Sequence, residues 1–223
     1  MRFLFALCFL LLSCGPSPAG PSDTTPKDSQ TIETTSKSAK RILFFGDSLT
    51  AGYGLLDYEM AWPHIVTKRL NAEGFDYSLT NAGISGDTTS GGLGRLDWVL
   101  QETPDIFVLE LGANDMLRGI TPDVTKENLR KMIQIVKTKA PKAKILLVGM
   151  IATPNLGKKY AGEFNAIYPN LAKEEKVPLV PFLLEKVAAK RKLNQKDGIH
   201  PTEEGHVLVA ETVYPYLKEL AGK

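Results

Sequence analysis

From Arg41 onward, short apolar runs alternate with longer amphipathic segments, and this alternation restricts the possible folds most strongly. The middle runs are apolar on successive residues, which is typical of strands buried on both faces of a parallel sheet. The alternation predicts a three-layer α/β/α sandwich with right-handed crossovers. We expect strands at 42–45, 77–80, 106–111, 145–149 and 177–181. We expect helices at 61–73, 94–102, 124–139, 162–175, 183–190 and 202–220.

The amino terminus has the pattern of an export signal. Met1 and Arg2 precede an apolar run from Phe3 to Leu12, which is too short to span a bilayer and is typical of a signal peptide. The run ends in Leu-Leu-Ser-Cys-Gly, which resembles a bacterial lipoprotein signal and implies lipidation of Cys14. The alternative is an ordinary cleavage site of small residues that leaves a free thiol.

Residues 15–40 are dominated by Ser, Thr, Pro and Gly. Such a segment buries too little apolar surface to offset the entropy of ordering it, so we expect a disordered tether. As a flexible chain it would have a root-mean-square reach of roughly 25 to 30 Å. The expected organisation is therefore a signal peptide over 1–13, a lipidated cysteine and tether over 14–40, and one domain over 41–223.

Charge and cysteine content exclude several classes of protein. The chain has 27 Lys and Arg against 25 Asp and Glu, without the basic block that a nucleic-acid binder needs. Its two cysteines cannot form a disulfide scaffold or a four-thiolate zinc site. No His, Asp or Glu cluster has metal-ligand spacing, so we expect neither a metal nor a cofactor.

Two polar segments contain the residue types of a serine nucleophile site. Gly46-Asp47-Ser48-Leu49 follows the first strand, where a serine can present its hydroxyl above the sheet beside backbone N–H groups. Asp197 and His200 lie three residues apart, so the carboxylate can orient the imidazole while its other nitrogen faces a hydroxyl. Taken alone, Ser48 is better explained as a helix cap and Asp-x-x-His as a loop hydrogen bond; it is their occurrence together that favours catalysis.

Two further loops contain candidate donors for an oxyanion. Gly86 follows the second strand and Asn114 follows the third. The backbone N–H groups of Ser48 and Gly86 and the side-chain amide of Asn114 can stabilise the oxyanion of acyl transfer. Gly83 is the alternative to Gly86.

Together the four segments resemble the SGNH (GDSL) hydrolase family, over about residues 41–220. Within it the chain is most similar to the bacterial arylesterase, acyl-CoA thioesterase and lysophospholipase group, which has stretches like GDSLTAGYG, NAGISGDTTSGGLGRL, ELGANDMLRG and DGIHP. The resemblance implies a flavodoxin-like fold with a five-stranded parallel sheet. It also implies Ser48 as nucleophile, His200 as general base and then acid, Asp197 as its orienting partner, and an oxyanion hole of Ser48, Gly86 and Asn114.

Three other polar residues are interpreted as structural. His64 and His206 fall in expected helices, and Asp47 is expected to bind backbone amides of the nucleophile loop, because Asp197 is already placed to orient His200. Ala113 stands where many family members have a second glycine, which implies a stiffer loop.

These patterns lead us to expect a monomeric, lipid-anchored serine esterase on the periplasmic or outer side of the cell envelope. Its substrates would be carboxylic esters, lysophospholipids included, with an acyl or aryl group held by loops 115–120 and 151–157. Acyl-CoA is not expected, because an exported enzyme does not meet the cytosolic pool. One alternative is a carbohydrate or peptidoglycan O-acetyl esterase, and another is a non-catalytic envelope lipoprotein.

Overall fold

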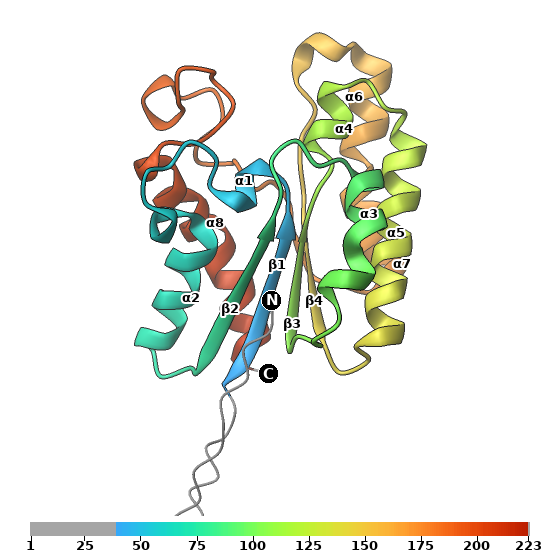
Figure 1. Ribbon diagram of the computed structural model, residues 1–223. Coiled ribbons are helices and arrows are strands. Elements are labelled where there is room, and N and C mark those ends of the chain that lie inside the picture. The colour runs from blue at the N-terminus through green and yellow to red at the C-terminus, as the bar shows by residue number, and fades with distance from the viewer. Residues whose placement is uncertain (1–38, 223) are drawn as a thin grey trace, which may run out of the picture. The chain divides into compact units, whose positions relative to one another are not determined.

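The computed structural model describes residues 39–222 as a five-stranded parallel sheet between two layers of helices (Figure 1). The spatial order β2-β1-β3-β4-β5 is that of flavodoxin-like folds, so the predicted fold class is confirmed. The predicted signal peptide, Cys14 and all but the end of the tether lie outside the described residues. The strands are β1 (Lys40–Gly46), β2 (Tyr77–Gly83), β3 (Ile106–Glu110), β4 (Lys144–Val148) and β5 (Leu179–Val180).

The helices divide between the two faces of the sheet (Figure 1). Helices α2 and α8 cover one face, and α3, α5 and α7 cover the other. The bounds are α1 (Ser48–Ala51), α2 (Trp62–Ala72), α3 (Thr89–Val99), α4 (Ala113–Leu117), α5 (Pro122–Lys139), α6 (Lys158–Asn165), α7 (Ile167–Glu175) and α8 (Glu203–Gly222). Short 3₁₀ turns are η1 (Tyr58–Met60), η2 (Pro154–Leu156) and η3 (Arg191–Leu193).

The core lies on both faces of the central strands. Ile42 to Phe45 of β1 and Phe107 to Leu109 of β3 are fully buried, because helices cover the sheet on each side. Trp62 of α2 meets Phe44 edge to face at 5.1 Å between ring centroids. No helix within residues 39–222 is long and apolar enough to cross a membrane.

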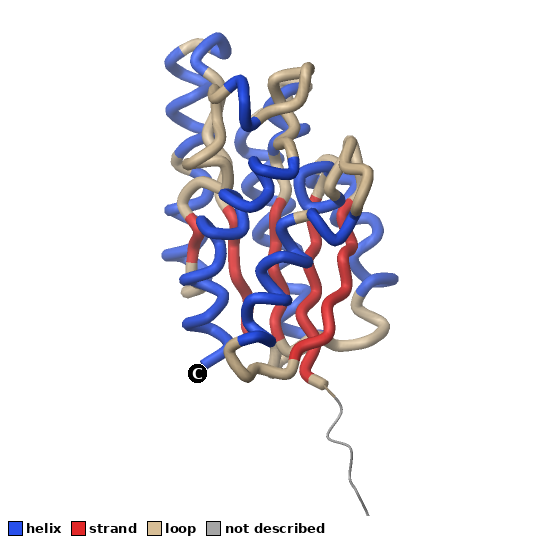
Figure 2. Tube along the Cα trace, turned by 90° about the vertical axis from the view of Figure 1, so that its left-hand side faces the viewer, coloured by secondary structure: helices blue, strands red, loops and turns tan. Residues whose placement is uncertain are grey.

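The parallel arrangement brings the loops that follow the strands to one end of the domain. Figure 2 shows the strands side by side with these loops gathered above them. The described chain enters at the opposite end, where β1 begins at Lys40, one residue before the predicted domain boundary. The segments that contain Ser48, Gly86 and Asn114 therefore meet at the carboxyl edge of the sheet.

The predicted helix 183–190 is wrong, because this segment is a series of turns. Leu183 and Val187 are buried as a helix would bury them, but Ala189 has a left-handed φ of 60°. The side-chain amide of Asn194 donates to the carbonyls of Val187 and Lys190, and so replaces helical N–H donors.

Other elements differ from the prediction mainly in their ends. The predicted helix 162–175 is divided at Ala166 into α6 and α7. The fifth strand has two residues rather than five, because the prolines at 178 and 181 lack the N–H that a longer ladder needs. Helix α3 begins five residues earlier than predicted, since the Thr88 hydroxyl caps the Gly91 N–H despite the low helix propensity of the glycines.

Candidate active site

Ser48 lies where β1 turns into the short helix α1. Asp47 caps this helix by accepting a 2.9 Å hydrogen bond from the Leu49 N–H. As the first helical residue, Ser48 has a backbone N–H without an intrahelical acceptor, so this donor is available to a ligand. The side chain of Ser48 lies at the carboxyl edge of the sheet, and the residue is 8% exposed.

The loop before α8 brings a histidine and an aspartate to this serine. His200 Nε2 lies 2.8 Å from Ser48 Oγ, and His200 Nδ1 lies 2.7 Å from Asp197 Oδ2. The other carboxylate oxygen of Asp197 accepts from the N–H groups of Ile199 and His200, at 2.9 and 3.1 Å. The three predicted residues therefore form one continuous chain of hydrogen bonds, although 152 positions separate Ser48 from His200.

The carboxyl of Asp197 is held in its ionised form. Partial burial by itself would raise its pKa, but the hydrogen bonds from the His200 ring and from the N–H groups of Ile199 and His200 outweigh this and lower the pKa to about 2. A negative charge beside Nδ1 favours the tautomer with a proton on that nitrogen and leaves Nε2 free to accept from the hydroxyl.

Tyr53 packs against the imidazole, and Gln195 fastens Tyr53 to the histidine loop. The Tyr53 ring packs on the His200 ring at 4.6 Å between centroids. Gln195 Nε2 donates to the carbonyls of Tyr53 and Pro201, at 2.7 and 2.9 Å, and so joins the loop after α1 to the histidine loop. Sequence reasoning did not identify either residue.

The amide of Asn114 is oriented by the nucleophile loop. Asn114 Nδ2 donates to Asp47 Oδ2 at 3.1 Å. A primary amide has two N–H groups, so one can bind Asp47 while the other serves an oxyanion. Asp47 is 1% exposed, and burial, followed by the negative charge of Glu110, raises its pKa well above the usual range. Ala113, beside this asparagine, opens helix α4, which the sequence did not predict.

The backbone distinguishes Gly86 from Gly83. The Gly83 N–H donates to Asn81 Oδ1 at 3.0 Å, and a Cβ at Gly83 would lie 2.3 Å from the backbone nitrogen of Ala51. Gly86 lies in a turn with a left-handed φ of 80°, and its N–H bonds no acceptor within residues 39–222. The geometry thus leaves Gly86, and not Gly83, as an available donor.

A buried carboxylate beneath the nucleophile loop was not identified from sequence. Glu110 Oε2 accepts from the Asp47 N–H at 3.3 Å and from the Thr50 hydroxyl at 2.8 Å. Burial raises the pKa of Glu110. A single acidic residue in an otherwise apolar strand was the available signal, and its contacts show that it fastens the turn that presents Ser48.

Two arginines, also not identified from sequence, tie the Gly86 loop to its neighbours. Arg95 forms a 2.7 Å ion pair with Asp87 and donates to the Gly46 carbonyl at 3.1 Å. Arg118 donates to the Gly86 carbonyl at 2.7 Å. The loops after β1, β2 and β3 are thereby cross-linked by charged hydrogen bonds.

The remaining histidines lie apart from this site. His206 is buried, and its Nδ1 accepts from the Trp62 N–H at 3.3 Å. Burial, and next the nearby charge of His200, lower the pKa of His206 to about 4, so it is neutral at pH 7. His64 lies in α2. In the portion of the chain that the structure describes, neither hydrogen-bonds to Ser48, and no cluster of three or more His, Cys, Asp or Glu could hold a metal.

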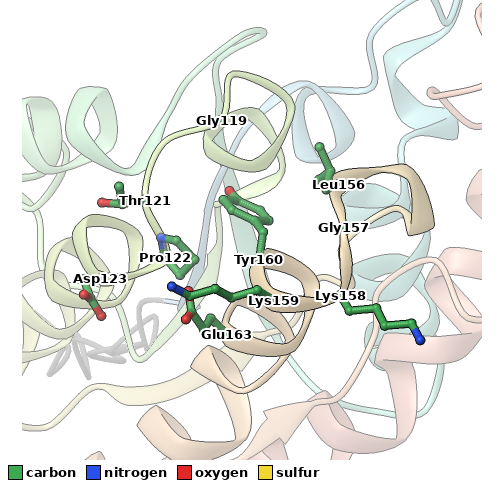
Figure 3. A pocket seen from close by; sticks show the side chains of 10 residues that line it. All are labelled: Gly119, Thr121, Pro122, Asp123, Leu156, Gly157, Lys158, Lys159, Tyr160 and Glu163. Atoms are coloured by element: carbon green, nitrogen blue, oxygen red, sulfur yellow. The ribbon is translucent and has the colours of Figure 1, made fainter.

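A hollow of about 620 Å³ separates the loop before α5 from the loop before α6 (Figure 3). Leu156 and Tyr160 line one side, and Pro122 lines the other. The Tyr160 hydroxyl donates to the Ile120 carbonyl at 2.8 Å and joins the two loops. Its lining includes none of Ser48, Asp197 and His200, so the hollow is separate from the hydrogen-bonded site.

Comparison with known proteins connects this geometry to one family. The model of the GDSL-like lipase/acylhydrolase family matches residues 44–208. Esterase TesA of Pseudomonas aeruginosa is 44% identical over 82% of this chain and 90% of its own length. Thioesterase 1/protease 1/lysophospholipase L1 of Escherichia coli K12 is 41% identical over 82% of this chain and 86% of its own. A crystal structure of TesA has a TM-score of 0.77 at 43% identity and covers 81% of this chain and 99% of that one.

The resemblance found in the sequence motifs is confirmed by these matches, and the five-stranded sheet agrees with the solved structure. The family match covers the segments of Ser48, Gly86, Asn114 and His200 without interruption. The chain therefore belongs to the GDSL-like lipase/acylhydrolase family and is an ester hydrolase of the SGNH type.

Proposed function

We propose that this enzyme hydrolyses carboxylic esters through an acyl-enzyme on Ser48. The observation that carries the proposal is the Ser48–His200–Asp197 chain, with distances of 2.8 and 2.7 Å. Both lie within the range for proton transfer between a nucleophile, a base and its orienting partner.

In the first half-reaction, Ser48 Oγ attacks the carbonyl carbon of the ester while His200 Nε2 takes the hydroxyl proton. Asp197 stabilises the imidazolium that forms. The tetrahedral intermediate then collapses, the bond to the leaving oxygen breaks, and His200 returns the proton to the departing alcohol. The acyl group remains on Ser48.

In the second half-reaction, water takes the place of the alcohol. His200 accepts a proton from the water as it attacks the acyl carbon, and returns a proton to Ser48 Oγ as the acid leaves. In both halves the oxyanion would be bound by the N–H groups of Ser48 and Gly86 and by the second N–H of Asn114. The support for this assignment is that the first two N–H groups bond no acceptor within the described part of the chain, and that Asp47 already orients the third donor.

Substitution of the nucleophile tests the mechanism. Ser48→Ala should reduce hydrolysis of p-nitrophenyl acetate by several orders of magnitude in purified protein, since no other group can form the acyl-enzyme. Thr50→Ser, a change in the same helix that keeps the hydroxyl bound to Glu110, is the control. Undiminished turnover in Ser48→Ala would refute the proposal.

Lysophospholipids are the proposed substrates among carboxylic esters. Supporting this, a relative at 41% identity is named a thioesterase, protease and lysophospholipase. Leu117, at the end of α4, and Ile151, in the loop after β4, also expose apolar side chains. A panel of p-nitrophenyl esters and lysophosphatidylcholines of increasing chain length tests this. Activity restricted to acetyl esters would instead favour an O-acetyl esterase.

We also propose that the enzyme is an exported monomer anchored to a membrane of the cell envelope through acylated Cys14. The support is the sequence pattern of residues 1–15. Mass spectrometry of the mature amino-terminal peptide should find an acylated Cys14 as the first residue. A peptide that begins elsewhere, or a free thiol at Cys14, would exclude the anchor, and light scattering of the purified enzyme would test the monomer.

A further inference from the structure

The exposed apolar side chains of the domain are concentrated at the end where the active site opens. Seven of them lie in the connections between a strand and the next long helix; Tyr53 packs on His200, and we name the other six the apolar rim. Its members are Leu56, Tyr58, Ile84, Leu117, Ile151 and Ile199. Single exposed apolar residues are ordinary, but several around one opening are typical of an interaction surface.

Leu56 is the extreme member of the rim. It is 98% exposed, so almost none of its surface packs on the protein. Tyr58, two residues later, is 68% exposed on the 3₁₀ turn η1. Neither side chain is held in place by packing in the core, so both are available to contact an apolar partner outside the protein.

The segment 190–196 supplies positive charge beside the rim. It reads Lys-Arg-Lys-Leu-Asn-Gln-Lys, contains no acidic residue, and leads directly into the Asp197–His200 loop. Arg191 and Lys196 line a hollow of about 590 Å³ within it. Arg191, Lys192 and Lys196 have no carboxylate partner among residues 39–222, whereas basic residues of α5 such as Lys126, Arg130 and Lys137 are paired.

The rim and the basic segment lie at the same end of the molecule. In Figure 1 the segments after β4 and β5 rise highest above the sheet, on either side of the loops around α1. The described chain begins at the other end, where β1 starts at Lys40. The tether expected from the sequence over 14–40 would be long enough for the domain to turn its loop end toward a membrane that holds Cys14.

We propose that this loop end docks on an anionic phospholipid surface. The apolar rim enters the headgroup region, and the cations of 190–196 contact lipid phosphates. Apolar side chains at the interface and basic residues on anionic headgroups are the two contributions that hold peripheral proteins on membranes. The proposal rests on the proposed function in one respect, that Ser48 takes a lysophospholipid from the surface on which the protein sits.

A fluorescence measurement tests the contact of the rim. Leu56→Trp in a Trp98→Phe background places an indole in the rim, and the unsubstituted chain reports on Trp98, which is 73% exposed on α3 away from these loops. Trp62 is buried in both proteins. On vesicles of brominated phosphatidylcholine with phosphatidylglycerol, the signal from position 56 should fall by about half and that of Trp98 should not change. Equal quenching at both positions, or none at 56, would overturn the proposal.

A charge substitution tests the basic segment. Replacement of its three unpaired cations by glutamine should lower lysophospholipid hydrolysis in anionic vesicles at least about tenfold, with hydrolysis of soluble p-nitrophenyl acetate unchanged. The test variant is Arg191→Gln, Lys192→Gln and Lys196→Gln. The matched control, from exposed lysines near the opposite end, is Lys142→Gln, Lys173→Gln and Lys176→Gln.

The two outcomes separate docking from catalysis. If the test and control variants lose vesicle activity equally, or neither loses any, docking through this segment is wrong while ester hydrolysis stands. If the unsubstituted enzyme fails to hydrolyse soluble p-nitrophenyl acetate, the proposed function itself is wrong.

Discussion

Asp47, the residue before the serine, binds the side chain of Asn114 across 67 positions of the chain, with 3.1 Å between Oδ2 and Nδ2. Through this hydrogen bond the nucleophile loop orients Asn114, which follows the neighbouring strand β3. The other oxygen of Asp47 caps the helix that Ser48 begins. One buried carboxyl therefore sets both the serine turn and the direction of the Asn114 amide.

Loss of this support should reduce turnover without abolishing binding. We expect Asp47→Ala to lower kcat for p-nitrophenyl acetate about 10- to 100-fold with little change in KM. Asn114→Ala should lower it about 10²- to 10³-fold, as for other oxyanion donors. Because Asp47 also caps the helix of Ser48, the double variant should be slower than Asn114→Ala, but by less than the product of the two single losses; the full product in steady-state kinetics would mean that the two residues act independently.

The two glycines after β2 should respond differently to alanine. A Cβ at Gly83 would lie 2.3 Å from the Ala51 nitrogen, so Gly83→Ala should destabilise the fold by several kcal/mol. At Gly86 the nearest atom is a flexible arginine nitrogen at 3.4 Å, and the left-handed φ should cost only about 1 to 2 kcal/mol. Thermal unfolding of both variants checks this, and a more stable Gly83→Ala than Gly86→Ala would contradict it.

His206 should make the fold sensitive to mild acid. Its pKa is about 4 in the folded protein, against 6.5 as the ordinary value. Below pH 6.5 the unfolded chain binds a proton that the folded chain takes up only near pH 4, so stability is lost across this interval, by at most about 3 kcal/mol. Urea unfolding of His206→Asn, whose Oδ1 can still accept from Trp62, should show a smaller loss between pH 6.5 and 4. The same pH dependence in both proteins would disprove it.

Asp197 should affect stability in a lower pH interval than His206, and again through its deprotonated form, which for a carboxyl is the charged one. Its pKa of about 2 lies below the ordinary 3.8, so the ionised carboxylate stabilises the folded protein above pH 3.8. This contribution disappears as the pH falls from 3.8 toward 2. The difference in unfolding free energy between the unsubstituted protein and Asp197→Asn should therefore be constant above pH 5 and shrink below pH 4. A difference that grows in acid would rule this account out.

Sequence patterns predicted the sheet and the principal polar residues because both depend on local signals. An apolar run such as 106–109 is typical of a strand that helices cover on both sides, and parallel strands bring their following loops together. Ser48, Gly86, Asn114 and the Asp197–His200 loop could thus be placed at one edge before any contact was known. The burial of both Leu183 and Val187, four residues apart, agrees with a helix, however, so periodicity alone did not reveal the turns there.

The supporting residues could not be predicted because their partners are distant in sequence. Arg95 lies in a helix and looks like an ordinary surface charge, but its guanidinium reaches the carbonyl of Gly46. Glu110 binds Asp47 and Thr50 from a different strand. These contacts depend on strand order and loop conformation, which residue spacing does not specify.

The central claim is that Ser48 is the nucleophile, activated by His200, and covalent labelling tests it most directly. After treatment with a fluorophosphonate, peptide mass spectrometry should find one adduct, on Ser48, absent in Ser48→Ala and formed at least about 10²-fold more slowly in His200→Ala. An active enzyme that is labelled on another residue, or not labelled at all, would contradict the account.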